Sequence, residues 1–406
     1  MKNKIIKALI KKGVHIPNPE SVYVSYDVNP DRISSDNVIL YAGTKIMGKQ
    51  SLIMKNVSIG YEAPVTLENT LVGENTCLNG GFFQETVFAG NNTFGSGAHV
   101  RKGTILEEEA NAAHTVGLKQ TILFPFVTLG SLINFCDCFM AGGTSRKNHS
   151  EVGSSFIHFN YTPNQDKATP SMFGDVHNGV MLRSSPIFLG GQGGIVGPVR
   201  IGYGCISAAG SIIRKNELKE DRLILGGAYK DMSMPRQFGI YNKVAQVYNN
   251  NIYYIAGLIA LNAWYKNIRP LFVYDEFSKY LVQGLQENLS ICIQERIDRL
   301  FHFGEKLEIS KEKLIFQLKY KTSASIVTHE KVLQKIEILQ KILNHALKDD
   351  SVNAAGVKFI KIVQEKINSS NKNYIEVIQH LNTIEQNIGS RWLLDIEQPI
   401  LEKLLI

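Results

Sequence analysis

The 406-residue chain has few cysteines, and they form no pattern that predicts a disulfide framework. The five are Cys77, Cys136, Cys138, Cys205 and Cys292. Cys136 and Cys138 stand two residues apart, but no second pair or histidine follows at a metal-ligand spacing, so we expect buried structural thiols and no metal site. Unpaired cysteines are typical of a reducing compartment, which predicts a cytoplasmic protein.

The sequence also lacks long apolar runs and blocks of like charge. No apolar segment of signal-peptide length follows the basic residues near the N-terminus, and the most apolar stretch, 252–264, is too short to span a bilayer. The net charge of +7 is not gathered into a run of Lys and Arg. We therefore expect no membrane span and no nucleic-acid partner, whereas a modest positive charge suits an anionic small molecule.

Glycine is common in the first half of the chain and rare after Gly257. Residues that favour helices dominate the second half, and Pro235 and Gly239 mark the change. This shift predicts two domains: residues 1–235, mainly β, and residues 236–406, all helical.

The first half carries an internal repeat of six residues. Ile59-Gly60 is followed six residues later by Val65-Thr66, and Val72-Gly73 is followed at the same interval by Leu78-Asn79. An aliphatic residue fills the interior of a prism, the small residue beside it permits a tight corner, and three such units close one coil. The period predicts a left-handed parallel β-helix over residues 14–215. A β-sandwich, the alternative, would show alternation with a period of two.

The repeat is interrupted in two places, at residues 82–86 and 145–172. At the second interruption we expect at least one loop that protrudes from the β-helix.

Apolar residues in the second half recur at intervals of three and four, over 277–300, 332–347 and 377–388. This spacing predicts amphipathic helices. Residues 241–264 predict a more apolar helix that packs against the β-helix. Because no group of catalytic side chains is evident there, we expect these helices to cap the β-helix or to build an oligomer.

The first half resembles a known family in residues 13–24, 38–44, 98–104, 190–199 and 201–213. They are similar to the acetyltransferase domain of the bifunctional N-acetylglucosamine-1-phosphate uridyltransferase / glucosamine-1-phosphate N-acetyltransferase family. The resemblance covers about residues 13–215. It implies acetyl-CoA as co-substrate, an amino-sugar phosphate or nucleotide sugar as acceptor, and a homotrimer with sites between neighbouring subunits. The family's uridyltransferase domain has no counterpart in this sequence.

The resemblance also implies roles for particular residues. Side chains that bind the sugar, its phosphate or the acyl donor match at Arg101, Lys119, Asn160, Tyr161 and Lys167, and positions that face coenzyme A match at Gly191 and Ala209. Asn134 stands where the family has a sugar-contacting tyrosine.

The family's catalytic histidine is replaced by Ser131. Serine has no useful basicity unless another group activates it, so we exclude Ser131 as the base. We expect His149 to be the base and His158 to be the second choice, with His114 as a further candidate. Arg146 and Lys147 beside His149 would keep its imidazole neutral and able to accept a proton.

These observations predict an acyl-CoA-dependent N-acetyltransferase that acts on a phosphorylated or nucleotide-linked amino sugar. Two alternatives stay open. One is a protein related to UDP-N-acetylglucosamine pyrophosphorylase without its own nucleotidyl site. The other is a non-catalytic β-helix scaffold whose helical domain binds a partner.

Overall fold

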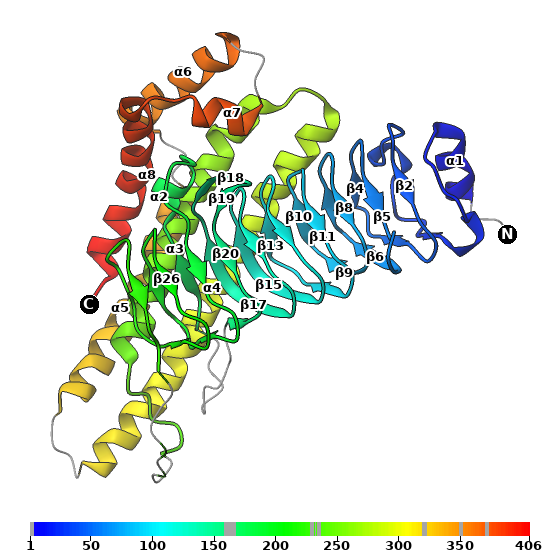
Figure 1. Ribbon diagram of the computed structural model, residues 1–406. Helices are drawn as coiled ribbons and strands as arrows, with labels where there is room; N and C mark the ends of the chain where they lie inside the picture. The colour runs from blue at the N-terminus through cyan, green and yellow to red at the C-terminus, as the bar shows by residue number, and fades with distance from the viewer. Residues whose placement is uncertain are drawn as a thin grey trace.

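Short parallel strands stack into a three-sided solenoid in the computed structural model (Figure 1). The structure describes residues 4–157, 168–227, 231, 233, 237–318, 323–348, 352–369 and 373–406. Strands within the solenoid pair in parallel with the strands one coil before and one coil after them, and strands at its ends pair on one side. The predicted fold class, a parallel β-helix followed by a helical region, is confirmed.

The three faces of the β-helix follow from the strand pairing. The first face contains β1 (Tyr23–Val24), β3 (Lys45–Met47), β6 (Val65–Glu68), β9 (Gly81–Gln84), β12 (Ala98–Val100), β21 (Phe156–Ile157), β24 (Gly194–Ile195) and β27 (Ile212–Ile213). The second face contains β4 (Leu52–Ile53), β7 (Leu71–Val72), β10 (Thr86–Phe88), β13 (Thr104–Leu106), β22 (Ser171–Phe173) and β25 (Arg200–Ile201). The third face contains β2 (Ile39–Leu40), β5 (Ser58–Ile59), β8 (Cys77–Leu78), β11 (Thr93–Phe94), β14 (Asn111–Ala112), β16 (Thr128–Leu129), β20 (Glu151–Val152), β23 (Phe188–Leu189), β26 (Ile206–Ser207) and β28 (Leu223–Ile224).

Two longer strands, β15 (Val116–Leu123) and β17 (Ile133–Met140), bend from the first face onto the second. We call the corner where they bend the first edge. The second edge joins the second and third faces, and the third edge joins the third face to the first.

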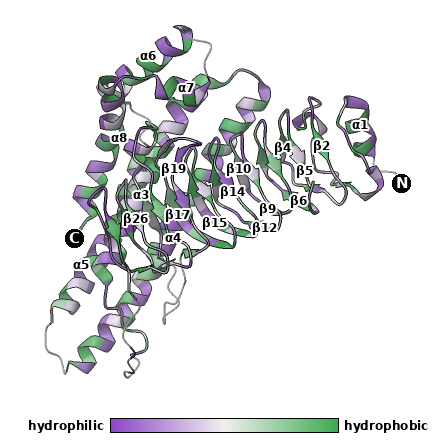
Figure 2. Cartoon of the chain, viewed as in Figure 1, coloured by the Kyte–Doolittle hydropathy of each residue, from purple (hydrophilic) through white to green (hydrophobic). Residues whose placement is uncertain are grey.

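Inward-facing aliphatic and aromatic residues fill the prism, as the six-residue repeat predicts. Hydrophobic and hydrophilic residues are interspersed along the strands of the solenoid (Figure 2). Phe83, Phe88 and Phe94 come from the three faces of one coil, are fully buried, and meet edge to face with ring centroids 5.3 to 6.0 Å apart. These residues share one continuous core with the helices.

The second edge turns through asparagines in the left-handed backbone region. Asn37, Asn56, Asn75 and Asn91 have φ between 52° and 56°, a conformation that asparagine tolerates better than other residues with a side chain. Their side chains form a ladder in which each amide donates to the next carbonyl oxygen, with distances of 3.1, 2.9 and 3.0 Å. The corners are therefore fixed both by backbone conformation and by side-chain hydrogen bonds.

The interruption of the sequence repeat at residues 82–86 has no counterpart in the structure, where these residues form regular coil. Phe82 and Phe83 lie in β9 and Thr86 begins β10, and both strands pair with the coils on either side. Glu85, with φ 46°, makes the bend between them. The apparent break in the sequence reflects large aromatic residues in place of aliphatic ones, which the interior accommodates.

The second interruption contains an insertion at the second edge. An antiparallel hairpin, β18 (Gly143–Ser145) and β19 (Asn148–His149), leaves the solenoid there, and the strands β20 and β21 resume the coils directly afterwards. The protruding loop predicted within residues 145–172 is thus partly this hairpin. Residues 158–167 lie outside the described residues.

Helices frame the β-helix. Beyond α1 (Lys4–Lys12) and the short α2 (Val176–Gly179), the described residues form α3 (Val244–Asn267), α4 (Glu276–Gln317), α5 (Ala324–Lys348), α6 (Ala354–Ser369), α7 (Tyr374–Gln379) and α8 (Thr383–Leu404). As predicted, the apolar helix α3 packs against the β-helix: Asn251 donates to the Ala168 carbonyl at 3.0 Å and Asn250 donates to the Pro198 carbonyl at 2.9 Å.

The apolar stripe over 377–388 belongs to two helices. Asn382 caps α8 by accepting from the backbone N–H of Ile384 and Glu385, so the stripe passes through a break between α7 and α8. The strands end at Ile224 and α3 begins at Val244, while the domain boundary at residue 235 falls outside the described residues and stays a prediction.

The long helix α4 covers the second face and runs along the solenoid axis (Figure 1). Its Asn288 donates to the Glu85 carbonyl at 2.8 Å, and its Arg296 donates to Asp137 at 2.9 Å. Eight helical residues rise about 12 Å, close to the height of the coils between Glu85 and Asp137 at about 4.8 Å each. The match of these two repeats lets α4 contact one coil after another.

Candidate active site

A row of side chains on the first face contains a gap. The strand register places Phe82, His99, Gly117, Asn134 and Phe156 in successive coils of this row. A Cβ added at Gly117 would meet no atom nearer than 3.7 Å, so the glycine leaves open space between His99 and Asn134. The His99 ring stacks on Phe82, with centroids 5.2 Å apart. The face can therefore admit a small molecule beside Asn134.

Two predicted phosphate ligands lie together at the first edge. The backbone N–H of Arg101 donates to the Leu118 carbonyl at 2.9 Å, which puts Arg101 and Lys119 in neighbouring coils, and Lys119 is paired with Cys136 in the next coil. Burial raises the pKa of the Cys136 thiol to about 11, with a contribution from Asp137, while the charges of Arg101 and Lys119 act against this rise. The thiol is thus neutral at physiological pH, so Cys136 does not cancel the positive charge of either cation.

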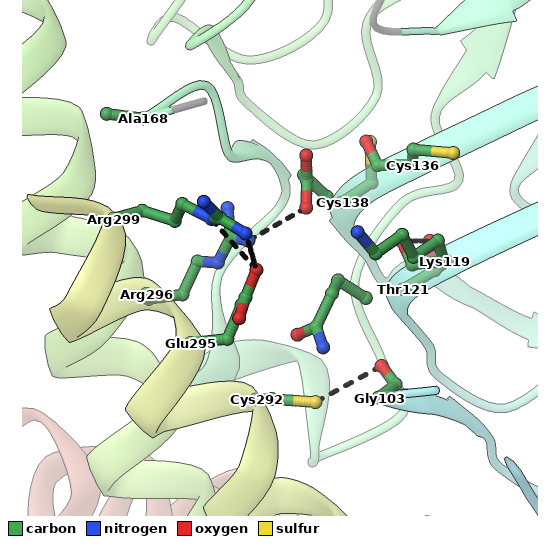
Figure 3. A network of polar contacts seen from close by, with 12 residues as sticks. Gly103, Lys119, Thr121, Cys136, Cys138, Ala168, Cys292, Glu295, Arg296 and Arg299 are labelled. Carbon is green, nitrogen blue, oxygen red and sulfur yellow. Dashed lines mark hydrogen bonds and ion pairs between the residues drawn. The ribbon is translucent and has the colours of Figure 1, made fainter. Parts of the chain in front are cut away.

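Helix α4 stands beside the same edge (Figure 3). Arg296, only 2% exposed, binds Asp137, and Glu295 accepts a hydrogen bond from Arg299 at 2.9 Å. Burial of Glu295 favours its neutral form, but Arg299, Arg296 and Lys119 outweigh this and lower the pKa of the carboxyl. In Figure 3, Lys119 extends from β15 toward α4. The helical region therefore places charged side chains of α4 beside the edge that carries Lys119. No pattern in the sequence indicated that these residues lie near the site.

At the third edge His114, a candidate base, contacts Ser131, the residue at the family's histidine position. His114 Nδ1 lies 2.9 Å from Ser131 Oγ, and the Leu132 N–H donates to the His114 carbonyl at 3.1 Å. Gly191 lies further along this edge, where its carbonyl accepts from Gly210 at 2.9 Å, next to Ala209. His114 and Ser131 are 17 residues apart, the length of one coil at this point, and that spacing was the signal for their contact.

The hairpin holds His149 at the second edge, away from the residues at the first edge and on the first face. Its Nδ1 is 2.8 Å from the Arg146 carbonyl oxygen, and its Nε2 is 3.5 Å from a Glu151 carboxylate oxygen. The Arg146 guanidinium reaches the two preceding coils, where it donates to the carbonyls of Phe126 and Glu109. The structure does not bring His149 to Lys119 or Asn134. Its role as base stays a prediction.

Four predicted site residues, His158, Asn160, Tyr161 and Lys167, lie outside the described residues. Their roles also stay predictions. The segment that carries them begins after β21, whose Phe156 pairs with Asn134, and ends before Ala168, which contacts α3.

Two further findings bear on the predicted partners. None of the helices in the described part of the chain combines the length and apolar character needed to cross a bilayer. Within the same residues, no cluster of three or more His, Cys, Asp or Glu side chains is placed to hold a metal ion.

The fold and the residue order define a class, the β-helices built from six-residue units. Over about half its length the chain is homologous to a particular protein with such a domain, the bifunctional protein GlmU. It is 28% identical to GlmU of Thermotoga maritima over 212 residues, 52% of this chain and 42% of the relative. It is 27% identical to GlmU of Streptococcus thermophilus over 220 residues, 53% of this chain and 42% of the relative.

The chain thus spans less than half the length of these relatives. No protein-family model matches it. The similarity and the β-helix confirm the resemblance to a GlmU-like acetyltransferase domain that the sequence motifs indicated.

Proposed function

We propose that this protein is an N-acetyltransferase that transfers the acetyl group of acetyl-CoA to the amine of a phosphorylated or nucleotide-linked amino sugar. We place it in cytoplasmic sugar-nucleotide metabolism. The observation that carries the proposal is the pair Arg101 and Lys119, two cations in neighbouring coils beside a face that is open at Gly117. Arginine offers a bidentate clamp for a phosphate, and the lysine adds a second charge.

The opposite side of the same face suits the acyl donor. Gly191 and Ala209 at the third edge present small residues, so a pantetheine chain can approach the backbone there, where N–H groups are the natural partners of its amides. The amine attacks the thioester carbonyl, a C–N bond forms, the C–S bond breaks, and a base takes the proton that the amine loses. No covalent enzyme intermediate is required.

The homotrimer remains part of this proposal. Because α4 of the same chain covers the second face, neighbouring subunits would have to pack on the first or third face. Exposed apolar side chains on the third face, Phe188, Ile206 and Leu223, offer a surface for such packing. Light scattering at micromolar concentration measures the oligomeric state, and a mass of one chain would exclude the trimer.

The same exposed apolar surface, together with Ser131 at the family's histidine position, supports the second candidate, a non-catalytic scaffold. The two functions differ in one property: only the enzyme must bind coenzyme A.

The test is to incubate the protein with acetyl-CoA and a panel of acceptors, and to detect products by mass spectrometry. The panel contains glucosamine-1-phosphate, UDP-linked amino sugars and unphosphorylated glucosamine. We expect acetylation of a phosphorylated acceptor and little of glucosamine, and we expect Arg101→Ala to remove this preference. Lys45→Ala, on the same face but several coils away, is the matched control. Absence of both product and coenzyme A binding would overturn the enzyme and favour the scaffold.

A further inference from the structure

We infer that His114 is the general base of the acetyl transfer and that Ser131 positions it; this inference rests on the proposed function and concerns the same site. A hydrogen bond 2.9 Å long joins His114 Nδ1 to Ser131 Oγ across adjacent coils at the third edge. Ser131 occupies the position where the family has its histidine. The imidazole is therefore supplied from one coil earlier and reaches the hydroxyl that stands at this position.

The geometry leaves one nitrogen of the ring available for chemistry. When Nδ1–H donates to Ser131 Oγ, the second nitrogen, Nε2, is unprotonated and can accept a proton. Among the described residues nothing binds Nε2, and the His114 side chain is exposed while Ser131 is half-buried. Fixing one ring nitrogen through a hydrogen bond is the usual way in which proteins orient a catalytic imidazole.

His114 lies on the same coil as Lys119, at the opposite end of the first face. The strand between them covers roughly 16 Å at about 3.3 Å per residue. Long side chains that extend from both ends of this span can hold a sugar phosphate between them. Asn134 is on the adjacent coil, beside the gap at Gly117. A sugar that lies there with its phosphate at Arg101 and Lys119 extends from the first edge toward the third edge, where His114 stands.

Three other described histidines lie on these faces or edges, and none contacts Ser131. His15 pairs with Ile39 at the start of the β-helix, several coils away. His149 contacts a backbone carbonyl and Glu151 at the second edge, and His99 stacks on Phe82. His114 is thus the described histidine whose ring contacts the position of the family's base.

The proposed step balances as follows. Nε2 of His114 takes one proton from the attacking amine while the C–N bond forms at the thioester carbonyl. Collapse of the tetrahedral species breaks the C–S bond, and the imidazolium returns that proton to the departing thiolate. Coenzyme A leaves as the thiol, and His114 is neutral again.

The experiment measures kcat and KM of wild type and variants with acetyl-CoA and the acceptor that wild type acetylates. We expect His114→Ala to lower kcat about a hundredfold or more, the usual scale for loss of a general base, with little change in acetyl-CoA affinity. His302→Ala is the control, because that histidine is 62% exposed on α4 and pairs with Glu305.

Two further variants separate catalysis from structure. Ser131→Thr keeps the hydroxyl and should retain most activity, whereas Ser131→Ala should lose a large part of it. In the double variant His114→Ala with Ser131→His, the imidazole stands on the coil that the family uses, and we expect activity to recover well above that of His114→Ala.

If wild type acetylates the sugar and His114→Ala is equally active, the inference is overturned and the proposed function stands. Loss of activity in His149→Ala but not in His114→Ala would overturn it in favour of His149. A wild type that neither binds coenzyme A nor forms product would overturn both.

Discussion

Glu107 gives the protein a pH-dependent stability that one substitution should remove. The residue follows β13, is 1% exposed, and its carboxylate accepts a hydrogen bond from the Tyr265 hydroxyl of α3 at 2.6 Å. Burial raises the pKa of Glu107 from 4.5 to about 7; Arg269 opposes the rise and Glu108 adds to it. Arg269 itself is engaged with Glu108, which limits its help to Glu107.

The direction of the effect follows from which state loses its proton first. Below about pH 4 the carboxyl is protonated in both the folded and the unfolded chain, so burial carries no ionisation cost. As pH rises the unfolded chain ionises first, so the free energy of unfolding falls between about pH 4.5 and 7 and levels off above. The pKa difference corresponds to about 3 kcal/mol, an order-of-magnitude figure for a buried group.

Glu107→Gln keeps an acceptor for Tyr265 and removes the titration. We expect the variant and wild type to unfold with similar free energies at pH 4.5, and the variant to be more stable by about 2 to 3 kcal/mol at pH 8. Urea denaturation followed by circular dichroism at both pH values measures this. Glu365→Gln, which alters an exposed pair with Lys361, should leave the pH dependence unchanged. If Glu107→Gln is instead destabilised at pH 8 relative to wild type, the carboxylate is ionised and stabilising, and the reasoning is refuted.

Three further predictions concern the corners and the site. Asn75→Ala loses two ladder hydrogen bonds and places alanine at φ 54°, so the free energy of unfolding should drop by about 1 to 2 kcal/mol. Asn75→Gly should lose less, because glycine adopts this backbone conformation readily. Equal losses in the two variants would mean that backbone conformation does not contribute at this corner. Arg101→Ala and Lys119→Ala should each raise KM for a phosphorylated acceptor by about tenfold or more, whereas the affinity for acetyl-CoA should not change. Initial rates measure both, and an unchanged KM would show that these residues do not bind the phosphate. The sequence-based assignment of His149 predicts about a hundredfold lower turnover in His149→Ala, whereas the inference that His114 is the base predicts turnover near that of wild type in the same variant. Full turnover would eliminate His149.

Much of the β-helix could be predicted because its cause is local. Inward aliphatic residues at a period of six, and small or left-handed residues at the corners, are visible in the sequence itself. The coil that contains Phe82 to Thr86 departs from the aliphatic pattern, and the sequence therefore does not predict it. The interior accepts Phe83 and Phe88 because their rings meet edge to face.

The candidate site was only partly predictable. Arg101 and Lys119 meet because they are one coil apart, which the repeat fixes. His114 and Ser131 also meet one coil apart, but this contact follows from the sequence only when the local coil length of 17 residues is known. The contribution of α4 was beyond reach, since a contact between Arg296 and Asp137 joins segments that no local pattern connects.

The long helix α4 also changes how this solenoid should come apart. A solenoid whose coils contact only their neighbours can fray from its ends or open in the middle, because each coil is stabilised locally. Here one helix of 42 residues reaches from Tyr280, beneath the Arg32 guanidinium in an early coil, to Arg296, bound to Asp137 in the middle of the stack. Opening any coil in that interval breaks its contact with the helix as well as with the adjacent coils. Amide hydrogens of the central coils should therefore exchange with solvent together with those of α4, as a single cooperative unit.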